Sequence, residues 1–257
     1  GTNVNSIKIG DKVACAGAGY ANHAEINAVP INLCVKLNEN SNLKHAAFNT
    51  LGAIAMQSVR QADLRIGETC VVIGLGLIGQ ITSLILKASG INTIGVDLSQ
   101  QKVDICNKYS VCDNAILRET PNIVEKINDF TNGIGSDAVI IAAATASVDP
   151  INFAGTVSRK KGIVVVVGDV PTNFDRNPFW YRKELELKMS CSYGPGRYDI
   201  NYEEKGQDYP IEYVRWTENR NMQAFQDLLF TKKINIDYLI SHQCSLDEAP
   251  KAYDLLI

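Results

Sequence analysis

Residues 70–97 of this chain read CVVIGLGLIGQITSLILKASGINTIGVD. The four apolar residues at its start predict a short buried strand, and the segment GLGLIG at 74–79 predicts a tight turn. A helix with an apolar face follows to about residue 89, and residues 93–96 predict a second strand that ends on an acid. This order predicts a βαβ unit of a parallel sheet.

The spacing Gly74-x-Gly76-x-x-Gly79 suits a turn that receives a pyrophosphate group. Gly74 allows the tight turn, Gly76 lets the backbone approach the phosphates, and Gly79 lets the helix pack closely on the strand. The helix N-terminus offers unpaired N–H groups to the same ligand. Asp97 lies about 20 residues further on, where its carboxylate can accept hydrogen bonds from the adenosine ribose hydroxyls. We therefore predict a dinucleotide site, the alternative being a glycine-rich turn without a ligand.

Composition excludes several classes of function. The chain has 257 residues and a formal net charge of −3, which argues against nucleic acid as a partner. We expect no membrane-spanning segment and no signal peptide. The seven cysteines are scattered without a CxxC pair, so we predict neither a disulfide framework nor a clustered zinc site. We interpret most of them as small buried residues of a cytoplasmic protein.

The rest of the chain predicts a second, different unit. Residues 1–37 show short β-rich runs, and residues 44–62 predict one amphipathic helix. After Asp97, helices and strands alternate as in a doubly wound parallel sheet. The predicted strands are 114–116, 138–142 and 163–167, and the predicted helices are 100–109, 123–131 and 153–158. Residues 185–191 predict a strand, and residues 221–230 and 246–256 predict helices, the last one opened by a Ser245–Glu248 capping box.

Taken together, these segments resemble the medium-chain dehydrogenase/reductase superfamily, whose best-known members are zinc alcohol dehydrogenases. The resemblance covers nearly the whole chain and rests on GDKV (10–13), GYANHAE (19–25), AAF (46–48), GET (67–69), the glycine turn, GVD (95–97), GSDAV (135–139) and GIVVVVG (162–168). More narrowly, CAGAGYA (15–21), SYGPGRYD (192–199) and YVRWTE (213–218) look like a bacterial two-domain oxidoreductase subgroup. Proteins of that subgroup often carry an additional C-terminal oxidoreductase domain.

The resemblance implies a division into two domains and a set of cofactor contacts. Residues 53–192 would form the Rossmann dinucleotide-binding domain. Residues 1–52 and 193–257 would form a discontinuous GroES-like β-rich catalytic domain that lacks its N-terminal part. The implied cofactor-binding residues are Gly74, Gly76, Leu77, Ile78, Gly79, Asp97, Lys102, Ala142, Thr145, Val167 and Gly168. No arginine follows Asp97 directly to meet a 2′-phosphate, so we predict NAD rather than NADP.

The chain departs from the zinc enzymes of the family at the metal site. An ungapped match places Asn49 where they have their third zinc ligand, and no CxxCxxC segment is present. We therefore predict no metal. A hydrogen-bond donor would then have to polarise the substrate carbonyl, and the loop around Gly194-Pro195-Gly196 offers Tyr193 and Arg197. We predict these two as catalytic, with a structural role for Tyr193 as the alternative. We expect Trp180, Tyr181 and Trp216 to pack between the domains.

The sequence as a whole predicts a zinc-independent, NAD(H)-dependent oxidoreductase that acts on a hydroxyl or carbonyl of a polar, sugar-like small molecule. Two alternatives stay open: a zinc-dependent alcohol or polyol dehydrogenase with its ligands outside this chain, and a non-catalytic NAD-binding scaffold for a partner domain. The resemblance also leaves room for a homodimer.

Overall fold

The computed structural model describes residue 4 and residues 6–255. In chain order its strands and helices are β1 (Val13–Cys15), β2 (Cys34–Lys36), α1 (Leu43–Ala46), α2 (Asn49–Ala62), β3 (Thr69–Ile73), α3 (Leu77–Ala88), β4 (Asn92–Asp97), α4 (Gln100–Lys108), β5 (Asn114–Leu117), α5 (Ile123–Phe130), β6 (Ser136–Ile141), α6 (Asp149–Val157), β7 (Ser158–Val166), α7 (Tyr181–Lys183), β8 (Glu186–Met189), α8 (Ile200–Glu203), α9 (Glu218–Phe230) and α10 (Ala249–Asp254). Short helical turns cover Ile31–Leu33, Arg176–Trp180, Asp237–Leu239 and Leu246–Glu248.

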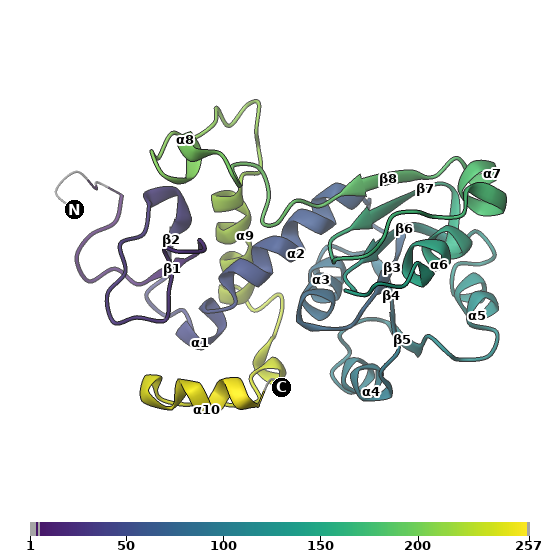
Figure 1. The fold of residues 1–257 in the computed structure, drawn as a ribbon, viewed down its shortest axis with the longest axis horizontal. Coiled ribbons are helices and arrows are strands. Elements are labelled where there is room, and N and C mark those ends of the chain that lie inside the picture. The colour runs from purple at the N-terminus through teal and green to yellow at the C-terminus, as the bar shows by residue number, and fades with distance from the viewer. Residues whose placement is uncertain (1–3, 5, 256–257) are drawn as a thin grey trace.

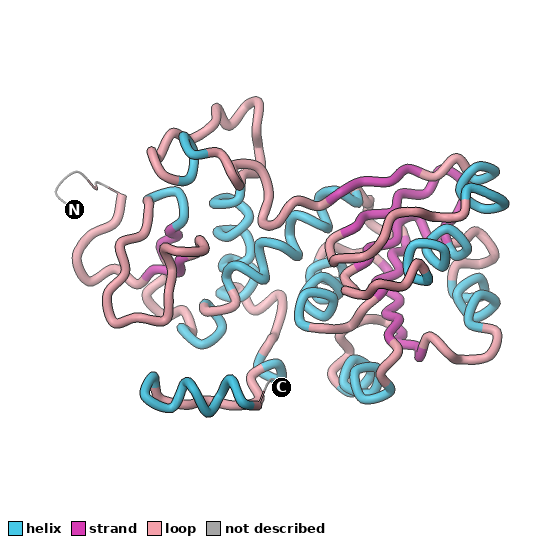
Figure 2. The backbone as a smooth tube through the Cα atoms, in the orientation of Figure 1, coloured by secondary structure: helices cyan, strands magenta, loops and turns pink. Residues whose placement is uncertain are grey.

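Six parallel strands form the larger sheet in the order β5-β4-β3-β6-β7-β8. Numbered within the sheet, this is the order 3-2-1-4-5-6 of a doubly wound fold, which confirms the predicted Rossmann class. All six strands lie in one half of the molecule, and the short magenta pair in the other half of Figure 2 is β1 and β2.

Alternation along the strands supplies two separate cores. Val71 and Ile73 of β3 point to the face that α5 and α6 cover, whereas Cys70 and Val72 point to the face that α2 and α3 cover. These side chains are buried on both faces, so the strands read as unbroken apolar runs in the sequence.

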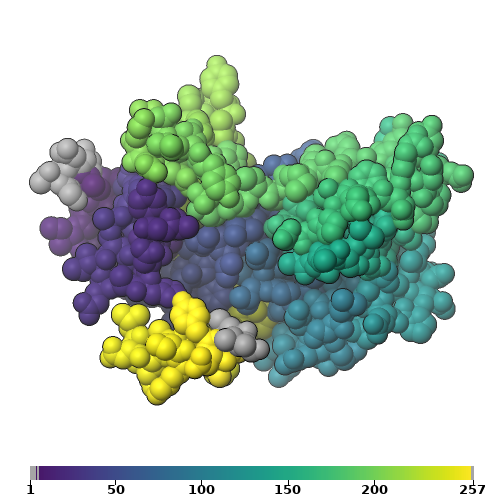
Figure 3. Space-filling model, in the orientation of Figure 1, coloured from purple at the N-terminus to yellow at the C-terminus, as the bar shows by residue number. Residues whose placement is uncertain are grey.

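The other half of the molecule contains residues from both ends of the chain. Its antiparallel pair β1–β2 packs on α2 and on Tyr193. In Figure 3 the yellow segment that contains α10 lies against part of the purple segment, and Tyr253 Oη is 3.1 Å from His23 Nδ1. In the described residues before α1, this pair is all that is formed of the predicted GroES-like β-rich domain.

Several predicted boundaries were wrong. The helix expected over 44–62 is interrupted, because Phe48 has φ −77° and ψ 9°, outside the helical range, so α1 and α2 are separate. The helix expected to begin at residue 221 begins at Glu218, since the Thr217 hydroxyl accepts the Arg220 N–H and caps it earlier. The Ser245–Glu248 capping box is confirmed. The last residue of the helix predicted over 246–256 lies outside the described residues.

The expectation for two aromatic residues was also wrong. Trp180 does not pack between the domains but stacks on Phe174 at 4.0 Å within the core under α6. Tyr181 is exposed. Within the described residues, no helix combines the length and the apolar character needed to cross a bilayer.

Candidate nucleotide-binding and catalytic sites

The glycine turn between β3 and α3 has the geometry that its sequence predicts. Gly74 has φ +94°, a left-handed conformation that favours glycine. A Cβ on Gly79 would collide with the Gly74 carbonyl oxygen, so this glycine is needed for close packing of α3 on β3. A Cβ on Gly76 would meet nothing within 4 Å. Space for a ligand therefore exists at Gly76.

Asp97 at the end of β4 is buried next to this turn. One carboxylate oxygen accepts the Leu75 N–H at 2.7 Å, and the other accepts the Ser99 N–H at 2.8 Å. The Lys102 ammonium lies 3.6 Å away. These contacts hold the carboxylate in one orientation and leave it lone pairs for further donors.

A cavity of about 450 Å³ opens above the carboxyl ends of these strands. At this edge a doubly wound sheet binds its ligands. Six of the predicted cofactor residues line it: Gly74, Gly76, Asp97, Lys102, Ala142 and Thr145. It is also lined by Arg118 and Asp149, which the sequence analysis did not include.

Arg118 and Asp149 form an ion pair at the rim of the cavity. The guanidinium donates Nε–H to one Asp149 oxygen at 3.0 Å and Nη2–H to the other at 2.7 Å. Its carbon lies 4.0 Å from the centroid of the Phe153 ring. The Arg118 N–H donates to the Asp97 carbonyl at 2.8 Å. Arg118 lies two residues after the strand predicted over 114–116, and this position could have revealed it, because the carboxyl ends of neighbouring parallel strands share one edge.

The remaining predicted cofactor residues do not line this cavity. Leu77 and Ile78 open α3, where N–H groups have no partner within the helix. Gly79 is enclosed, as described. Val167 and Gly168 follow β7, and both of their N–H groups donate to the Ile141 carbonyl. Cofactor contacts for these residues stay predictions.

Tyr193 and Arg197 lie away from this cavity, in the loop after β8. Tyr193 is buried against β1, β2 and α9, and burial raises the pKa of its phenol to about 12. Arg197 donates to Glu203 at 2.7 Å, and its guanidinium carbon lies 4.0 Å from the Tyr198 ring centroid. Neither residue lines the cavity at Asp97. Their catalytic role stays a prediction.

Glu218 is a buried acid that the sequence analysis missed. It opens α9 and is fully buried, and neither carboxylate oxygen has a hydrogen-bond partner among the described residues. Burial and the neighbouring Glu203 raise the pKa of its carboxyl to about 8, although Arg197 acts in the opposite direction. Glu218 is therefore largely protonated at neutral pH.

The described residues do not fit a catalytic zinc ion. Asn49 is buried at the start of α2, donates to Met222 Sδ at 3.0 Å and accepts from Gln226 at 2.8 Å. Over the described part of the chain, no three His, Cys, Asp or Glu side chains come together as metal ligands could. His45 instead pairs with Asp237, at 2.6 Å.

A larger hollow of about 580 Å³ lies between residues 36–41 and α9. None of the predicted site residues lines it. Residues of the glycine turn line the cavity at Asp97 but not this hollow.

Comparison with known proteins supports the resemblance to the medium-chain dehydrogenase/reductase superfamily. Residues 78–204 match the family model described as zinc-binding dehydrogenase. The chain is 26% identical over 263 residues to D-guloside 3-dehydrogenase of Shigella flexneri, covering 98% of this chain and 69% of that protein. It is 25% identical over 286 residues to a probable D-xylulose reductase A of Aspergillus clavatus, covering 98% and 72%.

A solved structure agrees with this fold. Alcohol dehydrogenase TADH from Thermus sp. ATN1 superposes with a TM-score of 0.68 at 22% identity, covering 87% of this chain and 59% of that one. This chain thus spans about three fifths of that enzyme. These matches confirm the resemblance to the medium-chain dehydrogenase/reductase superfamily, and the relatives that they name are dehydrogenases and reductases.

Proposed function

We propose that this protein is an NAD(H)-dependent oxidoreductase that transfers hydride between the cofactor and a hydroxyl or carbonyl group of a sugar-like or polyol-like small molecule, without zinc bound by the residues of this chain. Residues 53–192 would bind the cofactor, and residues 1–52 with 193–257 would contribute the substrate side. The observation that carries the proposal is one cavity that is lined both by Gly76, which has open space around it, and by Asp97, whose carboxylate is held in one orientation.

Different groups around the cavity would bind different parts of the cofactor. The N-terminal N–H groups of α3 would hold the pyrophosphate, and Asp97 would accept hydrogen bonds from the adenosine ribose hydroxyls. Bound NAD would supply the hydride acceptor. Arg118 is already neutralised by Asp149, so the described cavity lacks a free guanidinium for a 2′-phosphate. This favours NAD over NADP.

The substrate class rests on the names of the relatives. D-guloside 3-dehydrogenase and D-xylulose reductase act, by those names, on a glycoside and a ketose, which are both sugar-type molecules. Because these relatives share only about a quarter of their residues with this chain, the particular substrate is open to a direct screen of sugars and polyols.

Cofactor binding is tested with Gly76→Val. A valine side chain would occupy the open space where the pyrophosphate must approach the backbone, so we expect NADH affinity to fall by more than about tenfold. NADH fluorescence titration measures this, and Gly76→Ala should give a smaller loss. Circular dichroism must show that both variants are folded. Wild-type NADH affinity in a folded Gly76→Val protein would place the cofactor elsewhere.

The catalytic role of Tyr193 and Arg197 is tested separately. In Tyr193→Phe and Arg197→Lys, we expect hydride transfer, followed by NADH absorbance, to decrease while NADH affinity is retained. Arg197→Lys keeps the charge that pairs with Glu203, so loss of the fold is a lesser concern than in an alanine variant. Unchanged turnover in both variants would remove them from the mechanism.

One observation favours a second candidate, a cofactor-binding scaffold without turnover. Tyr193 is buried and Arg197 is engaged by Glu203, so neither is free at the described cavity. A protein that binds NADH tightly but neither oxidises nor reduces it with any polyol or ketose would support the scaffold. Stoichiometric zinc that is lost together with activity on chelation would instead support the zinc-dependent alternative.

A further inference from the structure

Two cysteines face each other across the small antiparallel sheet of the N-terminal half. Cys15 of β1 and Cys34 of β2 are direct partners in the register, and their sulfur atoms are 3.5 Å apart. Both are free thiols. Neither takes part in the nucleotide site.

The hydrogen bonds of the sheet show which type of antiparallel pair Cys15 and Cys34 form. The Ala16 N–H donates to the Leu33 carbonyl, and the Leu37 N–H donates to the Lys12 carbonyl. The hydrogen-bonded pairs therefore lie next to Cys15 and Cys34, which form a non-hydrogen-bonded pair. In such pairs the Cα atoms are about 4.5 Å apart, within the range of about 4.4–6.8 Å that a disulfide requires.

Alternation along the strands places these thiols away from the core. Ala14, Ala16, Leu33 and Val35 point inward, where they pack with Tyr193. The cysteines alternate with them and so face the opposite side of the ribbon, where both are only half-buried. A small oxidant can therefore reach them from solvent.

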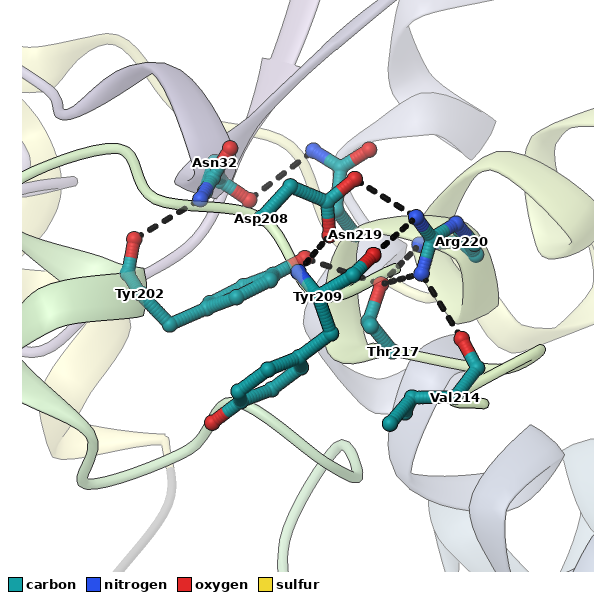
Figure 4. A network of polar contacts seen from close by, with 8 residues as sticks. All are labelled: Asn32, Tyr202, Asp208, Tyr209, Val214, Thr217, Asn219 and Arg220. Atoms are coloured by element: carbon teal, nitrogen blue, oxygen red, sulfur yellow. Dashed lines mark hydrogen bonds and ion pairs between the residues drawn. The ribbon is translucent and has the colours of Figure 1, made fainter. Parts of the chain in front are cut away.

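The backbone under Cys34 is held in place from another element. Asn219 at the start of α9 donates to the Asn32 carbonyl at 2.8 Å and to the Cys34 carbonyl at 2.9 Å. Asn32 in turn donates to the Tyr202 carbonyl at 2.8 Å, and the two asparagines lie together in Figure 4. β2 is thus anchored to α8 and α9, which keeps the two sulfur atoms close.

One of the two thiols is suited to act as a nucleophile. The hydrogen bond from Cys34 lowers the pKa of the Cys15 thiol to about 7, even though burial acts in the opposite direction. The thiolate is the reactive form of a cysteine, so this shift favours Cys15 as the nucleophile of the pair.

We propose that Cys15 and Cys34 are a redox-modification site that forms an intramolecular disulfide when the protein meets a hydroperoxide. The Cys15 thiolate attacks the terminal oxygen of the peroxide, an S–O bond forms, the O–O bond breaks, and the leaving alkoxide or hydroxide takes a proton from water. The Cys34 sulfur then attacks the sulfenic sulfur, the S–S bond forms, and the S–O bond breaks to release hydroxide, which takes the Cys34 proton and leaves as water. In sum, two thiols and one hydroperoxide give one disulfide, one alcohol or water molecule, and one water molecule.

The bond would close a covalent loop over residues 16–33. Tyr20 and Val29 of this loop pack against the cluster that contains Tyr193. Oxidation would therefore reduce the mobility of residues 16–33, which pack behind the loop that contains the predicted catalytic residues Tyr193 and Arg197.

The same chain contains a matched control pair. Cys106 and Cys112 also interact with each other, but both are buried in the core under α4. Because burial excludes the oxidant, this pair should remain reduced. Cys191 and Cys244 are exposed free thiols.

The test is hydrogen peroxide treatment of the whole chain, followed by alkylation, trypsin and mass spectrometry. Residues 13–36 form a single tryptic peptide that contains both thiols, since no Lys or Arg lies between Lys12 and Lys36. We expect this peptide to lose two hydrogen atoms and both alkylation sites, and to regain them after dithiothreitol. Cleavage at Glu25 should then leave two pieces that are joined until reduction.

Variants assign the steps. Cys34→Ser should lose the cross-link and accumulate a sulfenic acid at Cys15 that dimedone traps. Cys15→Ser should lose the cross-link, and its remaining Cys34 thiol should oxidise slowly. Cys106→Ser should form the cross-link as the wild type does. The proposal is overturned if the 13–36 peptide remains doubly alkylatable, if Cys15 oxidises further without a cross-link, or if Cys191 or Cys244 forms the disulfide instead.

Discussion

Asp97 and Arg118 carry opposite charges into one cavity from the ends of neighbouring strands. The carboxylate of Asp97 repels a 2′-phosphate, whereas a free guanidinium at Arg118 would attract it. Asp149 accepts two hydrogen bonds from Arg118 and neutralises its charge, so under the proposed function Asp149 would favour NAD. If the protein binds NAD here as proposed, cofactor choice depends on Asp149, a residue of the cavity that lies outside the glycine turn.

We predict that Asp149→Asn lowers the preference for NADH over NADPH by about tenfold, which corresponds to about 1.4 kcal/mol of differential binding. The substitution removes the negative charge that neutralises Arg118 but keeps a side chain of the same shape. Parallel fluorescence titrations with NADH and NADPH measure the ratio. Glu184→Gln breaks an exposed ion pair with Lys161, at 2.8 Å, and should leave the ratio unchanged. A constant or rising preference for NADH in Asp149→Asn would refute this role.

Helices α2 and α9 pack against each other at an angle, and α2 runs from the half that contains β1 and β2 to the large sheet (Figure 1). Ala62 at the end of α2 belongs to the core under the large sheet, whereas Ala53 near its start packs with β1 and β2. The helices can approach closely because the Phe225 ring of α9 lies where a Cβ of Gly52 would stand. One glycine thus determines the distance between two elements.

We expect Gly52→Ala to lower the free energy of unfolding by about 1–3 kcal/mol, the range for adding a methyl group to a filled core. Urea denaturation followed by circular dichroism measures this loss. Phe225→Leu creates space at the same contact, so the double variant Gly52→Ala/Phe225→Leu should lose less than the sum of the two single losses. Additive losses would show that the two positions are not coupled.

The fold of the whole molecule encloses an acid that the unfolded chain exposes to water. Glu218 has a carboxyl pKa of about 8 in the folded protein, against 4.5 for an ordinary glutamate. Between these values the folded state binds more protons than the unfolded state. The free energy of unfolding must therefore fall as pH rises through this range, by at most about 5 kcal/mol from this one group.

We predict that Glu218→Gln removes this component of the pH dependence. Denaturant unfolding at pH 5.5 and pH 8 should show a larger loss of stability in the wild type than in the variant, because glutamine does not titrate. Relative to the wild type, the free energy of unfolding of Glu218→Gln should be lower at pH 5.5, where the wild-type Glu218 is already neutral. It should be higher at pH 8, where part of the wild-type Glu218 is charged. Glu125→Gln, on the exposed face of α5, serves as the control. Equal slopes for wild type and Glu218→Gln would mean that Glu218 does not carry the buried proton.

The sequence by itself determined the features that depend on neighbours along the chain. The apolar run before Gly74, the helical spacing after Gly79 and the acid at residue 97 lie within one βαβ unit, so local periodicity and turn chemistry were enough to predict the sheet and its glycine turn. Element boundaries were predicted wrongly where a distant segment makes contact. One example is Phe48, which packs against residues of α9 and of the segment after it.

Only the tertiary structure decided the pairings between distant residues. Arg118 meets Asp149, Cys15 meets Cys34, and Glu218 is enclosed beside Arg197 and Glu203. None of these residues carries a sequence signal for its partner, because charge, nucleophilicity and protonation depend on which groups the fold brings within a few ångströms and on how much water it excludes. The physical reason is that secondary structure follows from local backbone and side-chain preferences, whereas the chemistry of a site follows from contacts between segments.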